Sequence, residues 1–503
     1  VDRDIIGKLN TGAGKTLIGL LMLQSKINEG VGPALYLCPD NQLVSQVLDQ
    51  ASLHDFRVVT LPKSDGNERV EFPVEFLNGQ SILVTTFERV FNGKSIFGVD
   101  GYGSREVIEI GAMVIDDAHT CIKKARAQCT ITIDDTHPSY NKIFEIFEED
   151  LEYQGAGQLS AIKMGHSSVC KMVPYWSWNN KFNHVSNIVE ELYENNDPSV
   201  FYSWGLIGDE LKDNCECYIS GTKIEITPTQ IPFEKIPSFN EANFRYILSA
   251  TFANDSELVR ELGISKESIL NPIQVENKGD AGERLIVAPR RYFNELDDNF
   301  MRKFISEYSS EHNVVVLVPG SIEAKKWEQL GAEVVNKDNI LESTKKLKNS
   351  RGNLMVFLNR YDGIDLEGDS CHILVLDGLP SAQSLRNQYY GTVREGSISH
   401  NTQVAQTIEQ GLGRSVRSGT DYSVVFVLNN SLLNFISIKR NQELFAPATR
   451  EQLEFGLELF NDEQPSSMEM AMNEISKAIE ICLSRNKDWR EFHKNLILDA
   501  PSI

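Results

Sequence analysis

The sequence predicts an α/β protein with two doubly wound parallel-sheet lobes, a mixed domain inserted into the first lobe, and a helical C-terminal segment. Three observations predict this class. Short apolar runs separated by amphipathic stretches recur in residues 1–120 and again in residues 280–445, the pattern of parallel strands joined by helices. The pattern changes between residues 121 and 243. The last ~60 residues lack such runs and have a helical pattern instead.

The expected elements follow in order along the chain. In the first region the strands are the apolar runs at residues 4–7, 34–38, 82–86 and 112–116, and a buried-strand pattern returns at 245–252. The inserted region contains the alternating segment CYISGTKIEITP, which predicts a hairpin around Gly221. In the second region the expected strands are RLIVAP, NVVVLVPG, NLMVFL, HILVLDG and YSVVFVL, at residues 284–289, 313–320, 353–358, 372–378 and 422–428.

The composition is that of a large acidic protein. The 503 residues contain 49 Lys and Arg against 71 Asp and Glu, a net charge of −22. This argues against a nonspecific basic coat, but a local basic groove can still bind phosphates. The eight Cys contain no C-x-x-C pair, so we expect free thiols in a reducing compartment.

Targeting signals are also missing from the sequence. No apolar run reaches the ~18 residues of a membrane span, and no secretory signal is visible. We therefore expect a cytoplasmic protein, nucleoid-associated if bacterial, that has no membrane partner. The chain opens directly before an apolar strand, which leaves room for a preceding segment with a targeting sequence.

The stretch LNTGAGKT at residues 9–16 predicts a phosphate-binding loop between a strand and a helix. Glycines let the backbone turn tightly around an anion, and the helix N-terminus adds a partial positive charge. Lys15 can reach the terminal phosphates of ATP, and Thr16 can offer its hydroxyl to Mg²⁺. The residues expected to bind the nucleotide are Thr11, Gly12, Ala13, Gly14, Lys15 and Thr16. A plain strand-to-helix turn is the alternative, because Leu9 replaces the first glycine of the strict pattern.

An acidic motif, VIDDAHT, ends the apolar run at residues 112–116. Asp116 stands where the carboxylate that holds Mg²⁺ belongs in a phosphate-loop protein. Asp117 can orient and deprotonate an attacking water. Taken alone, the motif also fits a solvated acidic turn.

Further motifs follow in a fixed order: PDNQLVSQ at 39–46, LVTTFERV at 83–90, LSATF at 248–252, NRYDGIDLEGD at 359–369 and QGLGRSVR at 410–417. With motif I at 9–16 and motif II at 116–119, this order resembles that of a superfamily 2 helicase. The further motifs of that family would then be Ia (Pro39, Leu43 and Gln46), Ib (Thr85 and Thr86), III (249–251), V (Gly363 and Asp365) and VI (Gln410, Gly413, Arg414 and Arg417). The segments LEGDSCHILVLDGLP and IEQGLGRSVRSGTDYSVVFVL, and the large insertion between motifs II and III, are most similar to the XPD/DinG-like branch.

The resemblance implies two RecA-like lobes and an arch-like insertion. Lobe 1 would comprise residues 1–120 and 245–275 and carry motifs I, Ia, Ib, II and III. The arch-like domain would occupy 121–244, and lobe 2, with motifs IV, V and VI, would occupy 276–445. Residues 446–503 would form a helical C-terminal extension.

The resemblance also assigns site residues. Arg414 and Arg417 act as arginine fingers on the γ-phosphate, and Gln410 belongs to the same motif. Gly363 and Asp365 belong to the nucleotide site. The residues implied to contact nucleic acid are Pro39, Thr85 and Thr86, and those implied to couple hydrolysis to strand grip are Ser249 and Thr251.

The sequence differs from the pattern of the XPD/DinG-like branch in two features. Many members hold an iron–sulfur cluster on four Cys between motifs I and II, but here that stretch contains only Cys38, so we expect no cluster. The missing cysteines leave open whether the duplex-splitting wedge and the 5′→3′ polarity of the branch apply to this chain. Asp117 replaces the usual Glu and is one methylene shorter, which can slow hydrolysis or require a repositioned water.

The leading hypothesis is an ATP-dependent DNA helicase or single-strand DNA translocase that uses Mg²⁺, with repair or defence against foreign DNA as the process. An RNA helicase is an alternative, as is a nucleotide-switched clamp or interaction subunit that does not unwind. A protein partner is plausible for each. Tyr175, Trp176 and Trp178 of the insertion could stack on bases, although we favour packing in the core of a small domain.

Overall fold

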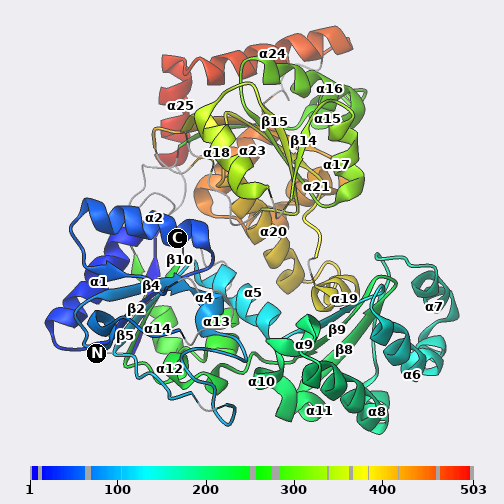
Figure 1. Cartoon of the computed structure of the whole chain (residues 1–503). Helices are drawn as coiled ribbons and strands as arrows, with labels where there is room; N and C mark the ends of the chain where they lie inside the picture. The colour runs from blue at the N-terminus through cyan, green and yellow to red at the C-terminus, as the bar shows by residue number, and fades with distance from the viewer. Residues whose placement is uncertain are drawn as a thin grey trace. The chain divides into compact units, whose positions relative to one another are not determined.

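Three sheets organise the computed structural model of the chain, which describes residues 3–9, 14–62, 70–103, 105–249, 256–274, 282–336, 339–361, 366, 368–382, 384–416, 419–459 and 465–498. By its contacts the chain forms two units, one of residues 1–275 and 382–393, the other of residues 276–381 and 394–503 (Figure 1). None of the described helices is long and apolar enough to cross a membrane.

The first sheet is fully parallel and has seven strands in the spatial order β11-β1-β10-β5-β2-β4-β3. The strands are β11 (Ile273–Gln274), β1 (Asp4–Lys8), β10 (Phe244–Ser249), β5 (Ala112–Asp116), β2 (Ala34–Cys38), β4 (Ile82–Thr86) and β3 (Val58–Val59). The helices of this part are α1 (Lys15–Asn28), α2 (Asn41–Leu53), α3 (Val74–Leu77), α4 (Phe87–Val90), α5 (Ala118–Gln128), α12 (Pro237–Asn240), α13 (Ser256–Leu262) and α14 (Lys266–Leu270). β1, β2, β4, β5 and β10 confirm the five predicted strands, because continuous apolar runs suit strands buried on both faces.

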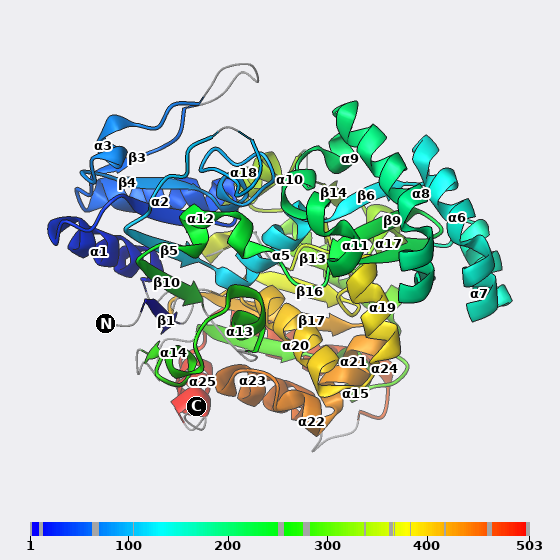
Figure 2. The same ribbon diagram turned by 90° about the horizontal axis from the view of Figure 1, so that it is seen from below.

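The inserted region contains an antiparallel sheet in the order β6-β9-β8-β7. Its strands are β6 (Ile131–Asp134), β9 (Lys223–Pro228), β8 (Cys215–Ser220) and β7 (Cys170–Met172), and β8 and β9 form the predicted hairpin around Gly221. Its helices are α6 (Pro138–Gln154), α7 (Ala156–Lys163), α8 (Tyr175–Glu194), α9 (Pro198–Phe201), α10 (Trp204–Ile207) and α11 (Leu211–Asn214). α6, α7 and α8 gather at the end of the insertion away from β1 and β10 (Figures 1 and 2).

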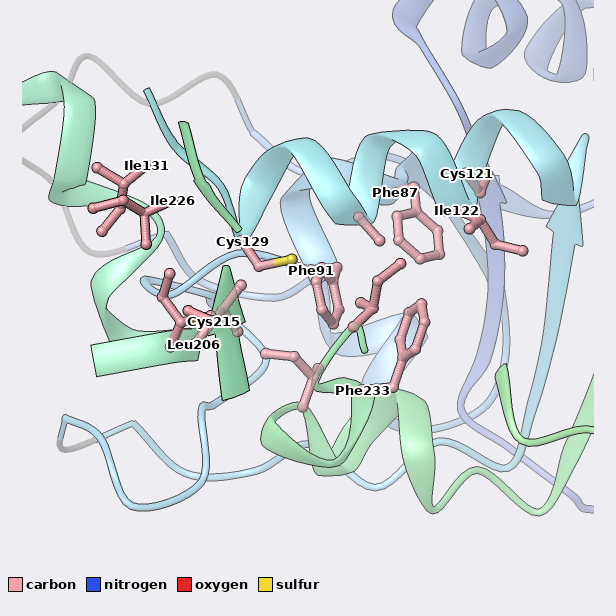
Figure 3. Close-up of a cluster of buried hydrophobic side chains, with 14 of the residues drawn as sticks. Phe87, Phe91, Cys121, Ile122, Cys129, Ile131, Leu206, Cys215, Ile226 and Phe233 are labelled. Atoms are coloured by element: carbon pink, nitrogen blue, oxygen red, sulfur yellow. The ribbon is translucent and has the colours of Figure 1, made fainter. Parts of the chain in front are cut away.

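The insertion and the first sheet share one hydrophobic core. Helix α5 leads from the end of β5 into the insertion, and its apolar residues belong to a single buried cluster with both parts. Figure 3 shows this cluster: Phe87 and Phe233 lie near the start of α5, while Cys215 and Ile226 of the inserted sheet lie beyond its end at Cys129. The insertion is therefore packed against the first sheet as part of the same unit.

Helix α19 (Leu385–Val393) also belongs to the first unit, although the chain on both sides of it belongs to the second. It packs on β7, β8 and β9. The Leu385 N–H donates to the buried carboxylate of Glu225 at 2.7 Å. Arg386 Nε lies 3.4 Å from Glu216 Oε2, and the Tyr390 hydroxyl donates to Glu216 Oε1 at 3.2 Å.

The second unit contains a parallel six-stranded sheet in the order β12-β17-β16-β13-β15-β14. Its strands are β12 (Glu283–Val287), β17 (Tyr422–Leu428), β16 (Ile373–Asp377), β13 (Val314–Val318), β15 (Leu354–Leu358) and β14 (Glu333–Val335). Its helices are α15 (Pro289–Tyr292), α16 (Asp298–Glu307), α17 (Ser321–Glu328), α18 (Ile340–Asn349), α20 (Ile398–Leu412), α21 (Asn430–Ser437), α22 (Lys439–Gln442), α23 (Pro447–Glu458), α24 (Met468–Leu483) and α25 (Lys487–Leu498).

The C-terminal helices confirm the predicted helical segment. They do not extend away from the second unit: apolar residues of α24 and α25 lie in the same buried cluster as residues of β12 and β17 (Figure 1). The fold therefore has the predicted class, with two parallel-sheet lobes, an inserted antiparallel sheet with helices, and a helical end.

Candidate nucleotide site

The carboxyl edge of the first sheet gathers five of the predicted motifs. Because β1, β10, β5, β2 and β4 are all parallel, the segments that follow them leave the sheet at the same edge. The register brings their ends level: Lys8 pairs with Ser249, Leu248 pairs with Asp116, and Cys38 pairs with Thr86. Motifs I, Ia, Ib, II and the start of motif III therefore lie along one edge.

The described end of the phosphate-binding loop has the geometry that its sequence requires. Gly14 precedes α1 with φ 75° and ψ 28°, a left-handed conformation that glycine adopts without steric cost. Lys15 and Thr16 follow as the first residues of α1, where backbone N–H groups and the helix dipole favour an anion. Thr11, Gly12 and Ala13 lie outside the described residues.

Asp116 is buried, with 3% of its surface exposed, at the end of β5. Its Oδ1 accepts a hydrogen bond from the Asp117 N–H at 3.0 Å, and its Oδ2 accepts one from the Tyr36 hydroxyl at 2.8 Å. Burial raises the pKa of this carboxyl, while the positive charge of Lys15 and the Tyr36 hydrogen bond oppose that rise. A buried carboxylate near a cationic lysine suits a divalent cation with phosphate oxygens.

Asp117 has a left-handed backbone, with φ 49° and ψ 60°, and stands at the N-cap position of α5. Asp and Asn tolerate this region better than other non-glycine residues, yet it still costs free energy. The carboxylate is held by the Thr120 hydroxyl, which donates to Oδ2 at 2.9 Å. The turn separates the two carboxylates, so Asp116 points inward while Asp117 remains partly exposed.

His119 and Glu257 connect motif II to helix α13. His119 Nδ1 lies 3.4 Å from Glu257 Oε2. Burial opposes ionisation of Glu257, but the hydrogen bond and charge of His119 overcome that effect and hold the pKa of the carboxyl below its usual value. This contact ties the helix after motif II to the segment that follows motif III.

The residues predicted to contact nucleic acid or to couple the motifs are mostly buried. Pro39 is buried directly after β2, and Thr85 and Thr86 expose only 5% and 8% of their surface. Ser249 is also buried, and its carbonyl accepts the Leu9 N–H at 3.0 Å. Thr251 lies outside the described residues. These buried side chains set the path of the backbone at the sheet edge.

Motif VI lies in the second unit, at the end of α20. Arg414 Nε donates to the Tyr361 carbonyl at 3.0 Å. A Cβ at Gly411 would meet the Tyr361 ring at 2.8 Å, so α20 packs closely on Tyr361, two residues before Gly363 of motif V. Gln410 is half-buried on the same helix. Gly363, Asp365 and Arg417 lie outside the described residues.

The aromatic residues of the insertion divide into two groups. Trp178 is buried, and its Nε1 donates to the Lys212 carbonyl at 3.1 Å, so it packs in the inserted domain as expected. Tyr175 and Trp176, at the start of α8, expose 72% and 53% of their surface and contact each other edge to face.

The donor set at the sheet edge fits Mg²⁺. In the described part of the chain, no group of three or more His, Cys, Asp or Glu side chains is arranged to hold a metal ion. Mg²⁺ does not need one, because it is usually bound through one or two protein oxygens together with phosphates and waters. The Thr16 hydroxyl and the Asp116 carboxylate supply oxygens of this kind, and Lys15 supplies charge for the phosphates.

Sequence reasoning missed two side chains of this site, Tyr36 and Thr120. The signal for Tyr36 is a single hydroxyl in the otherwise apolar strand ALYLC. A buried Tyr hydroxyl normally has a hydrogen-bond partner, but the sequence alone does not say which. Thr120 stands three residues after Asp117, the spacing at which helical side chains meet.

Comparisons with known proteins agree with this geometry. Residues 1–144 match the family described as DEAD/DEAH box helicase, and residues 292–452 match the family described as Helicase C-terminal domain. The fold is similar to that of Xpd4 from S. tokodaii, at 16% identity and a TM-score of 0.51, over 86% of this chain and 93% of that one. It is also similar to a structure named XPD_Helicase, at 14% identity and a TM-score of 0.54, over 88% of this chain and 94% of that one. A sequence search of curated proteins finds no match.

The two domains make the chain a superfamily 2 helicase, an enzyme of the ATPase/helicase class. Within that superfamily its fold is that of the XPD-like branch. The resemblance drawn from the order of the motifs is thereby confirmed.

Proposed function

We propose that the protein is an ATP-dependent DNA helicase or single-strand DNA translocase. The observation that carries the proposal is the meeting of motifs I and II at one sheet edge, where Lys15 and Thr16 begin α1 and the buried Asp116 ends β5. The resemblance of the motifs to the XPD/DinG-like branch, whose insertion forms an arch over DNA, is the reason for preferring DNA over RNA as the substrate.

In this proposal each residue has a role fixed by its chemistry. Lys15 neutralises the terminal phosphates of ATP, and the N–H groups at the start of α1 bind their oxygens. Thr16 and Asp116 hold Mg²⁺, which neutralises charge on the phosphates when bound. Asp117 orients the attacking water and accepts its proton.

The second unit supplies the remaining residues. Arg414 and Arg417 stabilise the charge that develops on the γ-phosphate, and Gln410, Gly363 and Asp365 complete the site. The proposal thus requires residues of both units, Lys15 of the first and Arg414 of the second, and it predicts that a nucleic-acid strand can stimulate hydrolysis.

We further propose that the enzyme works without an iron–sulfur cluster. The stretch between motifs I and II contains a single thiol, that of Cys38, which is buried at the end of β2. Burial raises the pKa of this thiol well above its usual value, so the thiolate that iron requires is disfavoured. Elemental analysis for iron of protein purified without oxygen tests this, and four iron atoms per chain would contradict it.

The proposed function is tested by ATP hydrolysis with single-stranded DNA, single-stranded RNA or blunt duplex, and by unwinding of 5′- and 3′-tailed duplexes. We expect low basal hydrolysis, strong stimulation by single-stranded DNA, and loss of hydrolysis in Lys15→Ala with an unchanged melting temperature. Stimulation by RNA alone would identify an RNA helicase. Nucleotide-dependent DNA binding without unwinding or translocation would identify a clamp, which the short Asp117 held by Thr120 would suit.

A further inference from the structure

Tyr36 occupies an unusual position in the first sheet. It is the central residue of β2, fully buried, in a strand whose other residues are apolar or Cys. Because β2 lies beside β5, the Tyr36 hydroxyl reaches Asp116 Oδ2 and donates to it at 2.8 Å. The bond joins the middle of one strand to the acidic motif at the end of its neighbour.

The Tyr36 hydroxyl is completely removed from solvent, and its proton has the Asp116 carboxylate as its partner. A phenol held in this way restricts the rotation of the carboxylate to which it donates. This bond is therefore the contact through which Tyr36 can act on the nucleotide site.

We propose that Tyr36 is a positioning residue for the Mg²⁺ of this enzyme, an inference that rests on the proposed Mg-ATP function. By donating to Asp116, it fixes the orientation of the carboxylate. Mg²⁺ demands near-ideal octahedral geometry, so fixing the orientation of one of its protein ligands before it binds lowers the cost of binding.

Gly19 provides independent support from the opposite side. It lies one turn after Lys15 in α1, and a Cβ there would stand 2.9 Å from Tyr36 Cε2 and 3.3 Å from the Tyr36 oxygen. Glycine inside a helix is destabilising relative to alanine. The helix therefore carries a destabilising residue at the position where any side chain would displace the Tyr36 ring.

The test is the binding of a fluorescent ADP to the full chain, measured in EDTA and in a titration with Mg²⁺. For Tyr36→Phe we expect unchanged affinity in EDTA and an about tenfold higher half-saturating Mg²⁺ concentration, the size expected when a hydrogen bond to a charged group is lost. Tyr140→Phe is the matched control: Tyr140 is also buried in the first unit, but its hydroxyl donates to the Ser220 carbonyl at 2.5 Å, in the insertion. It should leave both quantities unchanged.

Gly19→Ala tests the same inference with the hydroxyl present. We expect it to raise the Mg²⁺ requirement like Tyr36→Phe, and the double variant to show no further rise, because both act through one hydroxyl. An unchanged Mg²⁺ requirement in folded Tyr36→Phe, or equal effects of Tyr36→Phe and Tyr140→Phe, would overturn the inference. If Tyr36→Phe does not fold, Gly19→Ala decides the question. Absence of Mg²⁺-dependent nucleotide binding in the unmodified protein would instead refute the proposed function, and this inference with it.

Discussion

At the scale of single residues, Asp117 combines two constraints. Its left-handed backbone suits Asp or Asn, whereas the family pattern places the longer Glu at this position. At Asp117, therefore, the length of the side chain bears on hydrolysis and the conformation of the backbone bears on stability. Substitutions at this position can separate the two effects.

We expect Asp117→Asn to keep Mg-ATP binding and to lose hydrolysis, because the amide tolerates the backbone but cannot accept the proton of water. Asp117→Glu should retain or raise kcat, since it restores the reach of the family's carboxylate, while lowering the melting temperature through the strained backbone. Steady-state kinetics and thermal unfolding of both variants check this. Full activity of Asp117→Asn would assign the base to another residue.

We expect Arg414 and Arg417 to affect the rate of ATP hydrolysis more than the affinity for ATP. We expect Arg414→Ala and Arg417→Ala to reduce kcat, by as much as the order of 10³–10⁵ that an arginine finger contributes, with a much smaller change in ATP affinity. Arg414→Lys is the matched variant, because it keeps the charge but loses the Nε donor to the Tyr361 carbonyl. A loss of binding alone, at constant kcat, would contradict the finger role.

At the scale of elements, two helices join parts of the chain that the sequence separates. Helix α5 carries motif II at its start and packs into the insertion along its length (Figure 3). Deleting the insertion would open this shared core, so point substitutions are the better test of what the insertion does.

Helix α19 should depend on its ion pair with the insertion. We expect Arg386→Glu to place a second negative charge beside Glu216 and so to speed proteolysis of residues 382–393. The double variant Arg386→Glu with Glu216→Arg should restore much of the protection, because the pair is re-formed with reversed charges. Limited proteolysis read by mass spectrometry measures both. Equal cleavage in the single and double variants would mean that this ion pair does not hold α19.

Helix α25 should make the second unit sensitive to acid. His493 is buried, and its Nε2 lies 3.3 Å from the Arg284 N–H and 3.0 Å from Gln452 Nε2. Burial, reinforced by the charge of Arg284, lowers the pKa of His493 from 6.5 to about 4. The neutral ring is therefore the folded form, and its contribution is complete above the unfolded pKa and is lost as the pH falls from about 6.5 towards 4.

The expected loss over that range is on the order of 3 kcal/mol, because the pKa of His493 falls from 6.5 to about 4 on folding. Urea unfolding between pH 7 and 4 measures it. His493→Gln, which has no charge to gain, should show a flatter profile over the same range. Parallel profiles for the two proteins would show that another group causes the acid sensitivity.

At the scale of the whole molecule, the net charge of −22 opposes nucleic acid while the proposed function requires it. Binding must then rest on a limited number of phosphate contacts. We expect single-stranded DNA to stimulate hydrolysis strongly at low salt. The half-saturating DNA concentration should rise with salt at a log–log slope of about 0.7 per phosphate contacted. Hydrolysis rates against DNA concentration at several salt concentrations check this, and a rate indifferent to nucleic acid would contradict the helicase function.

The sequence by itself determined the class of the fold and which helicase motifs the chain contains. Continuous apolar runs such as ALYLC and AMVID predicted buried parallel strands, and the alternation around Gly221 predicted a hairpin, because hydrophobic periodicity reflects local burial. The meeting of Lys15 and Asp116 also followed from the sequence, since parallel strands that end in motifs share one edge.

Only the tertiary structure decided which partners each side chain finds. The direction of the Tyr36 hydroxyl depends on β2 lying next to β5, which no local pattern encodes. The strands β6 and β7, the core shared along α5, and the docking of α19 on an insertion more than a hundred residues earlier likewise arise from long-range packing. The hydrophobic periodicity of a sequence indicates whether a residue is buried, but it does not indicate which residues pack against it. The contacts that connect the motifs therefore appear only once the chain has folded.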